Sequence, residues 1–371
     1  MQDSPDMPDL AAAGAILDID LGAVRENYRR LRGRLSGGQC AAVVKADGYG
    51  LGAARVAKAL IGEGCGIFFV AHAGEGLSLR SAIGRGFDIY VLNGLPPGAE
   101  GQAVAAGLVP VCNSVEQLAA WRRTAGAFGR TLHVAVQVDS GMSRLGMTPA
   151  EVEVVAADRG SFDGLDLRLV MSHLACADEP KHPANESQRL RFDALRGKLP
   201  AAPTSPANSS GIFLGEAYHH DLARPGAALY GVNPTPRLPN PMLPVVRLSA
   251  KIIQCRALET GDCVGYGHAF RAMHPMRVAT ISLGYADGWP RRAIAGGWFE
   301  GVRLPLVGRV SMDSIVLDVS AIAPDRLKAG DLIEMIGPHQ SVDDLAAMAG
   351  TIGYEILTSL GPRFHRRYEG G

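Results

Sequence analysis

Short runs of Val, Ile and Leu recur through the first part of the chain, and their spacing constrains the fold more than any other feature. From residue 15 to about residue 240 these runs alternate with stretches of helical spacing, and successive runs lie about 20 to 30 residues apart. Continuous apolar runs suit parallel strands that are covered on both faces. The expected strands are 41–44, 66–71, 88–92, 108–112, 132–138, 167–172, 204–208 and 227–232.

Eight strand–helix units predict a closed (β/α)8 barrel of the TIM type, with the chemistry at the carboxyl ends of the strands. A proline cluster at 234–241 can continue neither a helix nor a central strand and is typical of a linker. Beyond it, short apolar runs separated by glycine turns predict a mostly β domain, with one helix over 342–349 that starts after Ser341 and ends at Gly350. We therefore expect a barrel domain over residues 1–240 and a β domain over 241–371.

Composition excludes several classes of function. The 371 residues carry 37 basic and 37 acidic side chains without a basic block, which argues against a nucleic-acid partner. The apolar runs are far shorter than the roughly 20 residues of a membrane span, and the acidic, proline-bearing N-terminus does not resemble a secretory signal. Six cysteines without close pairing indicate buried thiols in a reducing compartment, so we expect a cytoplasmic protein. Nothing in the pattern indicates a metal site.

Lys45 lies where the strand 41–44 should end and a glycine-rich turn should begin. Burying an ammonium group is costly unless the group is paired or loses its charge. A desolvated lysine has a depressed pKa and can form a Schiff base with an aldehyde such as pyridoxal phosphate. The alternative is a lysine at a strand edge that reaches solvent.

Arg144 and His173 also fall where barrel strands should end. Two glycines around Arg144 allow a sharp turn, so its guanidinium could hold an oxyanion, or it could be a surface group paired with Asp139. His173 follows the strand 167–172 and is either a catalytic group or an ordinary core histidine.

Two later loops are candidates for binding a cofactor. The run Asn208-Ser209-Ser210-Gly211 offers backbone N–H groups to a phosphate, although Asn-Ser-Ser is also an ordinary helix cap. Arg224 precedes a rigid proline and the permissive Gly226 in a second loop.

The segment AVVKADGYGLG over 42–52 closely resembles the cofactor-attachment motif of alanine racemases, which are pyridoxal-phosphate enzymes with a barrel and a second β domain. The resemblance extends from about residue 17 to residue 368. It implies that Lys45 attaches the cofactor, and that Arg224 faces the pyridine nitrogen. A guanidinium cannot readily give that nitrogen a proton, and this limits side reactions such as transamination.

Racemisation needs a base on each face of the α-carbon, and Lys45 can serve only one face. The segment Val264-Gly265-Tyr266-Gly267 resembles the part of the family that supplies a catalytic tyrosine to the partner subunit. The resemblance therefore implies a homodimer with shared active sites, in which His173 hydrogen-bonds the phenol of Tyr266 and Arg224 supports His173. The alternative is that Gly-Tyr-Gly is an ordinary turn with a half-buried tyrosine ring and no catalytic role.

Three further segments match the family. The resemblance implies that Tyr285 borders the substrate entrance, that the N–H of Met312 binds the substrate carboxylate, and that Tyr354 reaches the cofactor phosphate and narrows the pocket. The implied substrate-binding residues are Arg144, Met312 and Tyr285. The implied cofactor-binding residues are Lys45, Tyr49, Arg144, His173, Asn208, Ser209, Arg224, Gly226 and Tyr354.

One position departs from the family. Many members carry a lysine, often carbamylated, seven residues before the arginine that matches Arg144, and here that position is Gln137. Gln137 cannot be carbamylated, so Arg144 must be held by the Gln137 amide, by an anion, or less firmly.

The implied activity is interconversion of L- and D-alanine, either to supply D-alanine for peptidoglycan or to break alanine down. The alternatives are a racemase of larger amino acids, an amino-acid decarboxylase on a related plan, and a pyridoxal-phosphate carrier without catalysis. Tyr354 favours a small side chain. The cysteine donor and glycine-rich phosphate segments of the decarboxylases are not recognised here, and a carrier would have no use for the β domain.

Overall fold

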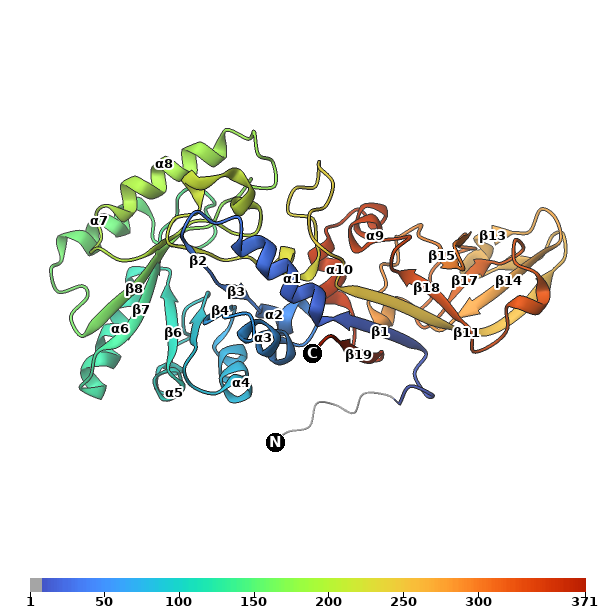
Figure 1. The fold of residues 1–371 in the computed structure, drawn as a ribbon, viewed down its shortest axis with the longest axis horizontal. Helices are drawn as coiled ribbons and strands as arrows, with labels where there is room; N and C mark the ends of the chain where they lie inside the picture. Colours follow the sequence, from blue (N-terminus) through green and yellow to red (C-terminus); the bar gives the residue numbers. More distant parts are fainter. Residues whose placement is uncertain (1–8) are drawn as a thin grey trace. The chain divides into compact units, whose positions relative to one another are not determined.

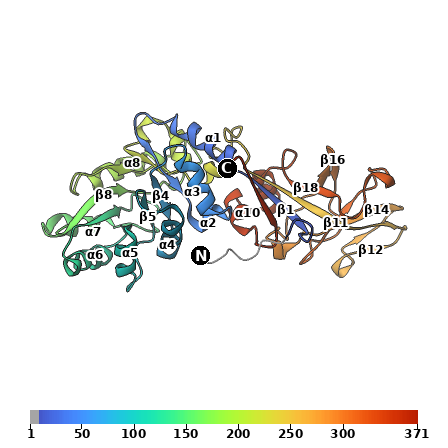
Figure 2. The ribbon, with the colours of Figure 1, turned by 60° about the horizontal axis from the view of Figure 1, so that its bottom comes forward.

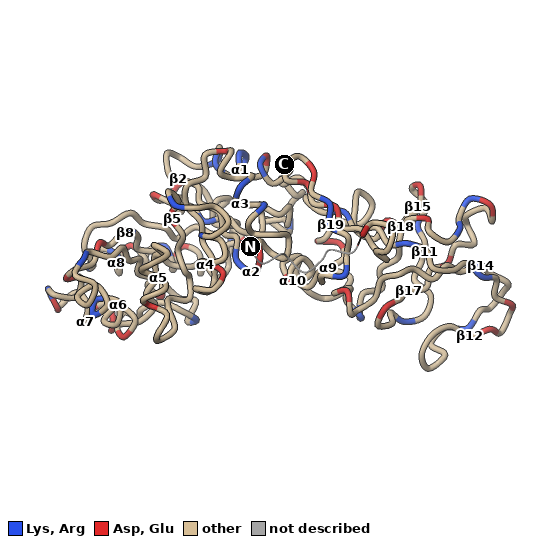
Figure 3. The backbone as a smooth tube through the Cα atoms, turned by 90° about the horizontal axis from the view of Figure 1, so that it is seen from below, with Lys and Arg blue, Asp and Glu red and all other residues tan. Residues whose placement is uncertain are grey.

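The computed structural model describes residues 9–371, which form two compact units. One unit is Val24–Leu243, and the other combines the described residues up to Ala23 with Pro244–Gly371. Figure 1 shows parallel strands and helices in the first unit and mostly strands in the second. Basic and acidic residues are interspersed along both units (Figure 3). Within the described residues, no helix combines the length and the apolar character that crossing a bilayer requires.

A ring of parallel strands forms the first unit. Seven strands pair in the order β3-β4-β5-β6-β7-β8-β9, and β10 pairs in parallel with β2, which directly precedes β3. Hydrogen bonds close the ring between β9 and β10, because the N–H of Asp221 donates to the oxygen of Thr204 at 3.1 Å. The strands are β2 (Gln39–Cys40), β3 (Ala42–Val43), β4 (Ile67–Val70), β5 (Asp88–Val91), β6 (Leu108–Cys112), β7 (Leu132–Gln137), β8 (Leu165–Met171), β9 (Thr204–Ser205) and β10 (Leu222–Ala223).

Helices lie outside this ring (Figures 1 and 2). The α-helices of regular geometry are α1 (Leu21–Arg32), α3 (Ala53–Ile61), α4 (Ala73–Ile83), α5 (Glu100–Ala106), α6 (Val115–Phe128), α7 (Pro149–Ala157) and α8 (Ala184–Arg196). The side chain of Ser114 accepts the N–H of Gln117, which caps α6 where the sequence predicts a helix start. The barrel fold is confirmed.

The eighth strand lies earlier than expected. The sequence places it at 227–232, but Ala227–Tyr230 forms a 3-10 turn, η3, and the strand that closes the barrel is β10. Pro225 lacks an N–H and cannot donate to a strand ladder, so the extended segment ends before it. The chain then turns, and the N–H of Leu229 donates to the oxygen of Gly226 at 2.8 Å.

The β unit has an eight-stranded sheet whose main path is β16-β15-β18-β11-β1-β19. Strand β1 pairs antiparallel with β11 and parallel with β19, so the first strand of the described residues belongs to this sheet and not to the barrel. The structure thus differs from the expected division at its N-terminal end. The strands are β1 (Ala15–Asp20), β11 (Val246–Leu258), β14 (Met276–Ile281), β15 (Gly297–Phe299), β16 (Val302–Leu304), β17 (Ile315–Asp318), β18 (Leu332–Ile336) and β19 (His365–Glu369).

Three smaller elements complete the β unit. A hairpin of β12 (Cys263–Val264) and β13 (Phe270–Arg271) pairs antiparallel, and the helices are α9 (Val342–Ala349) and α10 (Gly353–Ser359). Ser341 accepts the N–H of Asp344, and Gly350 ends α9 in the left-handed conformation, so both predicted ends of this helix are confirmed.

Candidate active site

Lys45 lies at the carboxyl end of a barrel strand. It follows Val44, whose N–H donates to the oxygen of Phe69 on the neighbouring strand at 2.9 Å. The side chain is half-buried. Burial lowers the pKa of the Lys45 ammonium, the charge of Arg144 lowers it further, and Glu75 opposes them. Lys45 is therefore closer to the free amine, the nucleophilic form, than an exposed lysine would be.

The residues after Lys45 form a short turn of left-handed helix. In the segment α2 (Lys45–Tyr49), Ala46 and Asp47 both have φ 52° and ψ 48°, and Tyr49 has φ 54°. Left-handed backbone costs roughly 1–2 kcal/mol for each residue that carries a Cβ. Hydrogen bonds from the N–H of Gly48 to Val44 and from the N–H of Ala53 to Asp47 Oδ1 hold the turn. Strained backbone of this kind is typical of functional sites.

Tyr49 ends this turn and packs inside the barrel end. Its ring lies 4.7 Å from the ring of Tyr230, whose hydroxyl donates to the oxygen of Val43 at 3.1 Å. A Cβ built on Gly226 would lie 2.3 Å from the Tyr49 hydroxyl oxygen. Any side chain at 226 would therefore push the phenol away from the loop after β10.

The hydroxyl of Ser209 binds two backbone N–H groups of the loop that follows β10. It accepts from the N–H of Gly226 at 2.9 Å and of Ala228 at 3.3 Å. Asn208 Oδ1 accepts the N–H of Gly211 at 2.9 Å, so the capping interpretation of Asn-Ser-Ser holds for Asn208. Converging N–H groups beside a hydroxyl and a phenol are suited to a phosphate.

Arg224 is buried, with 3% of its surface exposed. Its guanidinium donates to the oxygen and hydroxyl of Ser205, and at 2.6 Å to the main-chain oxygen of Ser172. Burial lowers its pKa to about 9, so the group remains largely protonated at neutral pH. Asp221, close by in sequence, accepts hydrogen bonds from Thr204 instead.

His173 follows β8, and three positively charged side chains act on its pKa. Burial lowers the pKa of the imidazole to about 3, with further contributions from Arg224, Arg144 and Lys45. The four side chains thus share one end of the barrel, and His173 is neutral at physiological pH. The interpretation of His173 as an isolated core histidine does not fit these neighbours.

Arg144 is exposed on the loop after β7. Asp139 shapes this loop, because its Oδ1 accepts the N–H groups of Gly141, Met142 and Ser143 at 2.8 to 3.0 Å. That carboxylate oxygen serves the backbone and not the guanidinium of Arg144. Gln137, at the end of β7, is buried.

Tyr266 belongs to the β unit, at the tip of the β12–β13 hairpin. Gly265 and Gly267 flank it with φ 77° and 68°, a conformation that favours glycine. The hairpin packs Val264 and Phe270 onto a small apolar core, and the Tyr266 side chain is 75% exposed. The expected turn is present, but the ring is not half-buried.

Tyr285 and Met312 lie on two loops that hydrogen-bond to each other. The N–H of Tyr285 donates to the oxygen of Ser311 at 3.1 Å, and the N–H of Ala286 to that of Met312 at 3.0 Å. Both side chains are exposed. Tyr354 is half-buried near the start of α10 in the same unit.

Arg363 ties these two loops together. Its Nε donates to buried Asp287 at 2.6 Å, and its Nη1 to Asp313 at 2.8 Å. Asp287 also accepts the N–H of Gly284 at 2.8 Å, which fixes the turn that carries Tyr285.

Sequence reasoning missed Glu75, Ser172, Ser205, Tyr230 and Arg363, all of which hold candidate residues. Tyr230 and Ser172 belong to segments that the sequence analysis predicted as strands, but their roles depend on contacts between separate strands. Glu75 had one signal, since it falls at the third position of a helix that follows a strand.

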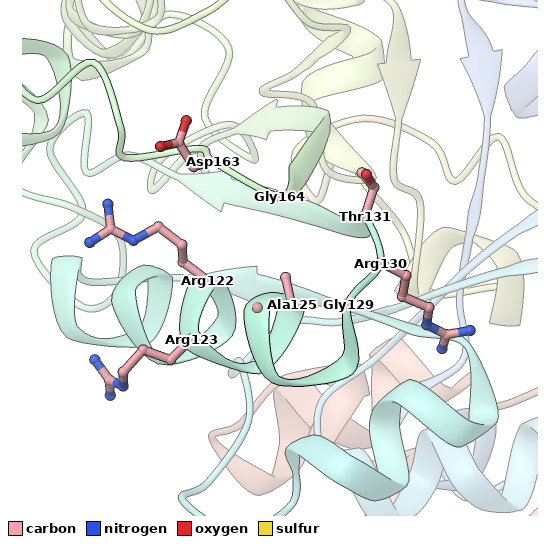
Figure 4. Close-up of a pocket in the computed structure, with 9 residues that line it drawn as sticks. Arg122, Arg123, Ala125, Gly129, Arg130, Thr131, Asp163 and Gly164 are labelled. Atoms are coloured by element: carbon pink, nitrogen blue, oxygen red, sulfur yellow. The ribbon is translucent and has the colours of Figure 1, made fainter.

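A shallow hollow of about 600 Å³ lies at the opposite end of the barrel, beside the end of α6 and the starts of β7 and β8. Three arginines line it, but Figure 4 shows Arg130 pointing away from Arg122 and Arg123. Arg122 donates to the oxygen of Gly160, and Arg130 to that of Val104. Because two of the three guanidinium groups are already hydrogen-bonded and Arg130 points away from the others, they do not form a common anion site.

Comparison with known families decides the assignment. Residues 19–234 match the family described as alanine racemase, N-terminal domain, and residues 245–368 match the alanine racemase C-terminal domain. The chain belongs to the alanine racemase family. It is 68% identical over 361 residues to the catabolic alanine racemase of Mesorhizobium japonicum, covering 97% of this chain and 95% of the relative. It is 51% identical to the catabolic alanine racemase of Agrobacterium fabrum, covering 96% and 93%.

Solved structures of alanine racemases agree with the fold. The alanine racemase of Bartonella henselae, solved with covalently bound pyridoxal phosphate, has a TM-score of 0.92 and 40% identity, covering 96% of this chain and 99% of that one. The enzyme of Streptomyces coelicolor has a TM-score of 0.91 at 33% identity, covering 96% and 98%. The expected resemblance to alanine racemases and the expected barrel with a second β domain are confirmed.

Proposed function

We propose that this protein is an alanine racemase that uses pyridoxal phosphate to interconvert L- and D-alanine. The observation that carries the proposal is Lys45, a half-buried amine of lowered pKa at the carboxyl end of a barrel strand. The chain as a whole is 68% identical to a protein named as a catabolic alanine racemase. A pyridoxal-phosphate carrier without the β unit is disfavoured, because both family domains are present.

The residues of the barrel unit fit the cofactor. Lys45 would supply the amine for its aldehyde, and Arg224, whose guanidinium is held by Ser172, would supply a buried cation for the pyridine nitrogen. The Tyr49 phenol, the Ser209 hydroxyl and the N–H of Gly226, which now donates to Ser209, would hold the cofactor phosphate, and the family resemblance adds Asn208 and Tyr354. When bound, the cofactor withdraws electrons from the α-carbon of the amino acid and makes its hydrogen acidic.

This chain's own groups then move the proton. The amine of Lys45 exchanges it on one face of the α-carbon, and the phenol of Tyr266 exchanges it on the opposite face. A phenol is a weak base because its ordinary pKa is near 10. The neutral imidazole of His173 can accept the phenolic hydrogen bond, and burial together with the charge of Arg224 lowers the pKa of that imidazole. Arg144 and the N–H of Met312 bind the substrate carboxylate, and Tyr285 borders the entrance.

The active form proposed is a homodimer in which Tyr266 completes the site of the partner subunit. Its 75% exposed ring on a hairpin tip supports this arrangement. Inactive Lys45→Ala and Tyr266→Phe chains should regain partial activity when their subunits exchange, because a hybrid dimer carries one intact site. Fluorescence energy transfer between labelled chains verifies exchange, and absence of rescue in exchanged dimers contradicts shared sites.

The physiological role proposed is breakdown of alanine in the cytoplasm, since two relatives at 68% and 51% identity are named catabolic. A deletion strain should then lose growth on one alanine enantiomer as sole carbon source. Dependence on added D-alanine for cell-wall synthesis would indicate the peptidoglycan role instead.

The decisive experiment combines a spectrum with a chiral assay. The purified protein should absorb near about 420 nm, as the family resemblance implies, and borohydride should fix the cofactor to Lys45. Chiral chromatography with alanine, serine, lysine and arginine should show alanine as the preferred substrate. Retention of full activity in Lys45→Ala, or faster turnover of the larger amino acids, would overturn the proposal.

A further inference from the structure

Glu75 joins the ends of two neighbouring barrel strands. Its Oε2 accepts the N–H of Ala71 at 2.7 Å and of His72 at 3.2 Å, both directly after β4. Its Oε1 accepts the N–H of Ala46 at 2.8 Å, the residue after Lys45 at the end of β3. Strands β3 and β4 are parallel neighbours, so one carboxylate bridges their two exits.

The Ala46 N–H needs an acceptor from outside its own turn. The first N–H groups of any helical turn lack an internal partner. Ala46 is also the first left-handed residue after Lys45, with φ 52°. The carboxylate of Glu75 therefore holds the strained turn at the residue bonded to Lys45, and a charged acceptor strengthens that bond.

A matched glutamate in the same unit shows what an ordinary cap looks like. Glu151 occupies the same third position in α7, and its Oε2 accepts only the N–H and hydroxyl of Thr148, the cap residue of its own helix. Glu75 makes the equivalent contact with His72 and adds the bond to Ala46.

We propose that Glu75 is a positioning residue for Lys45, which fixes the left-handed turn after it and so aims the amine at the cofactor aldehyde. The role deepens the proposed function and rests on it. The charges around the amine are consistent with this role. The carboxylate of Glu75 raises the pKa of Lys45, whereas burial and Arg144 lower it. The charge of Lys45 in turn contributes to the lowered pKa of His173 at the end of β8.

The test compares Glu75→Gln with Glu151→Gln. A carboxamide has one acceptor oxygen and an NH2 donor, so the side chain in Glu75→Gln can serve either Ala46 or the Ala71 and His72 pair, but not both. Trace acetylation of cofactor-free protein with acetic anhydride, followed from about pH 6 to pH 11 by peptide mass spectrometry, gives the titration of each lysine across its ordinary range. The other five lysines of the chain are internal references.

Three results are expected. The apparent pKa of Lys45 falls in Glu75→Gln and stays at the wild-type value in Glu151→Gln. The affinity for pyridoxal phosphate, measured by borohydride trapping on Lys45, falls about tenfold in Glu75→Gln only, as for loss of a charge-assisted hydrogen bond. Thermal unfolding shifts less in Glu151→Gln, because the carboxamide oxygen can still accept the N–H of Thr148, whereas Glu75→Gln must give up one of its two sets of partners.

An unchanged Lys45 titration in folded Glu75→Gln would overturn the proposal, as would equal losses of cofactor affinity in both variants. The proposed function can fail separately. If wild-type protein traps no pyridoxal phosphate on Lys45, the proposed cofactor chemistry is wrong, whereas the acetylation profile still decides whether Glu75 governs the Lys45 amine.

Discussion

Arg224 donates a hydrogen bond of 2.6 Å to the main-chain oxygen of Ser172, the residue directly before His173. The same guanidinium lies close enough to depress the pKa of the His173 imidazole. One buried cation thus fixes the backbone that carries the histidine, and it adds to the burial that lowers the pKa of that histidine.

Replacing Arg224 by glutamine should raise the pKa of His173, because the nearby positive charge is removed. The pKa should remain below its ordinary value of about 6.5, since burial is the larger cause. NMR titration of the histidine Cε1–H signals measures the change, with His173→Gln to assign the signal. The control is Arg168→Gln, an exposed arginine on β8 that pairs with Asp166. A His173 signal that titrates as in wild type would contradict the assigned charge contact.

His173 should make the cofactor-free protein sensitive to acid. Its pKa is about 3 when folded and about 6.5 when unfolded, so the unfolded chain binds more protons between these values. The stabilisation is complete above about pH 6.5 and is lost as the pH falls toward about 3, at up to about 1.4 kcal/mol per pH unit.

Urea unfolding at about pH 7.5 and about pH 5, on either side of the ordinary histidine pKa, tests this sign. The free energy of unfolding should fall less between the two pH values in His173→Gln than in wild type. His274→Gln, an exposed histidine of the β unit, should keep the wild-type difference. Identical acid losses in all three proteins would show that His173 titrates normally.

Gly226→Ala should reduce the free energy of unfolding by about 1–3 kcal/mol, because the new methyl group meets the Tyr49 hydroxyl oxygen. Adding Tyr49→Phe should recover part of the loss, since the next contact, with Tyr49 Cζ, is at 3.1 Å. Unfolding of the four proteins of the double-mutant cycle measures the coupling. Gly101→Ala is the matched control, because no atom beyond its chain neighbours and the backbone of its own helix lies within 4 Å of the new Cβ. Additive effects at 226 and 49 would refute the steric link.

Arg363→Met should loosen the two loops that carry Tyr285 and Met312, because it removes the link between Asp287 and Asp313. If those loops bind substrate, the KM for alanine should rise more than kcat falls. Steady-state kinetics in both directions measure this split. Arg326→Met removes an exposed pair with Glu300 in the same unit and should leave KM unchanged. A loss confined to kcat would remove Arg363 from substrate binding.

The sequence predicted the barrel well wherever the apolar residues of a single segment are enough to identify a strand. The apolar runs located seven barrel strands, and the end of 41–44 located Lys45. The prediction of a strand at 227–232 was wrong, because its apolar residues suit a buried 3-10 turn as well as a strand. Propensity does not separate these two structures.

The unpredicted parts all depend on contacts between distant segments. An apolar strand at 15–20 looks the same whether it enters a barrel or a sheet, and only its pairing with β11 and β19 decides. Glu75 gives no sign in the sequence that it reaches Ala46, since that contact exists only because β3 and β4 are neighbours. The predicted role of Tyr266 stays a prediction, although its exposure excludes a buried ring.

The pairing of β1 with β19 joins two segments that are made at very different times during synthesis of the chain. Asp18 on β1 meets Arg367 on β19, 349 positions later. A ribosome therefore releases the first strand long before its partners exist, while Val24–Leu243 already contains every strand of the barrel. Unpaired strand edges are sites of aggregation. The edges of β1 therefore stay unpaired until β11 and then β19 have been made.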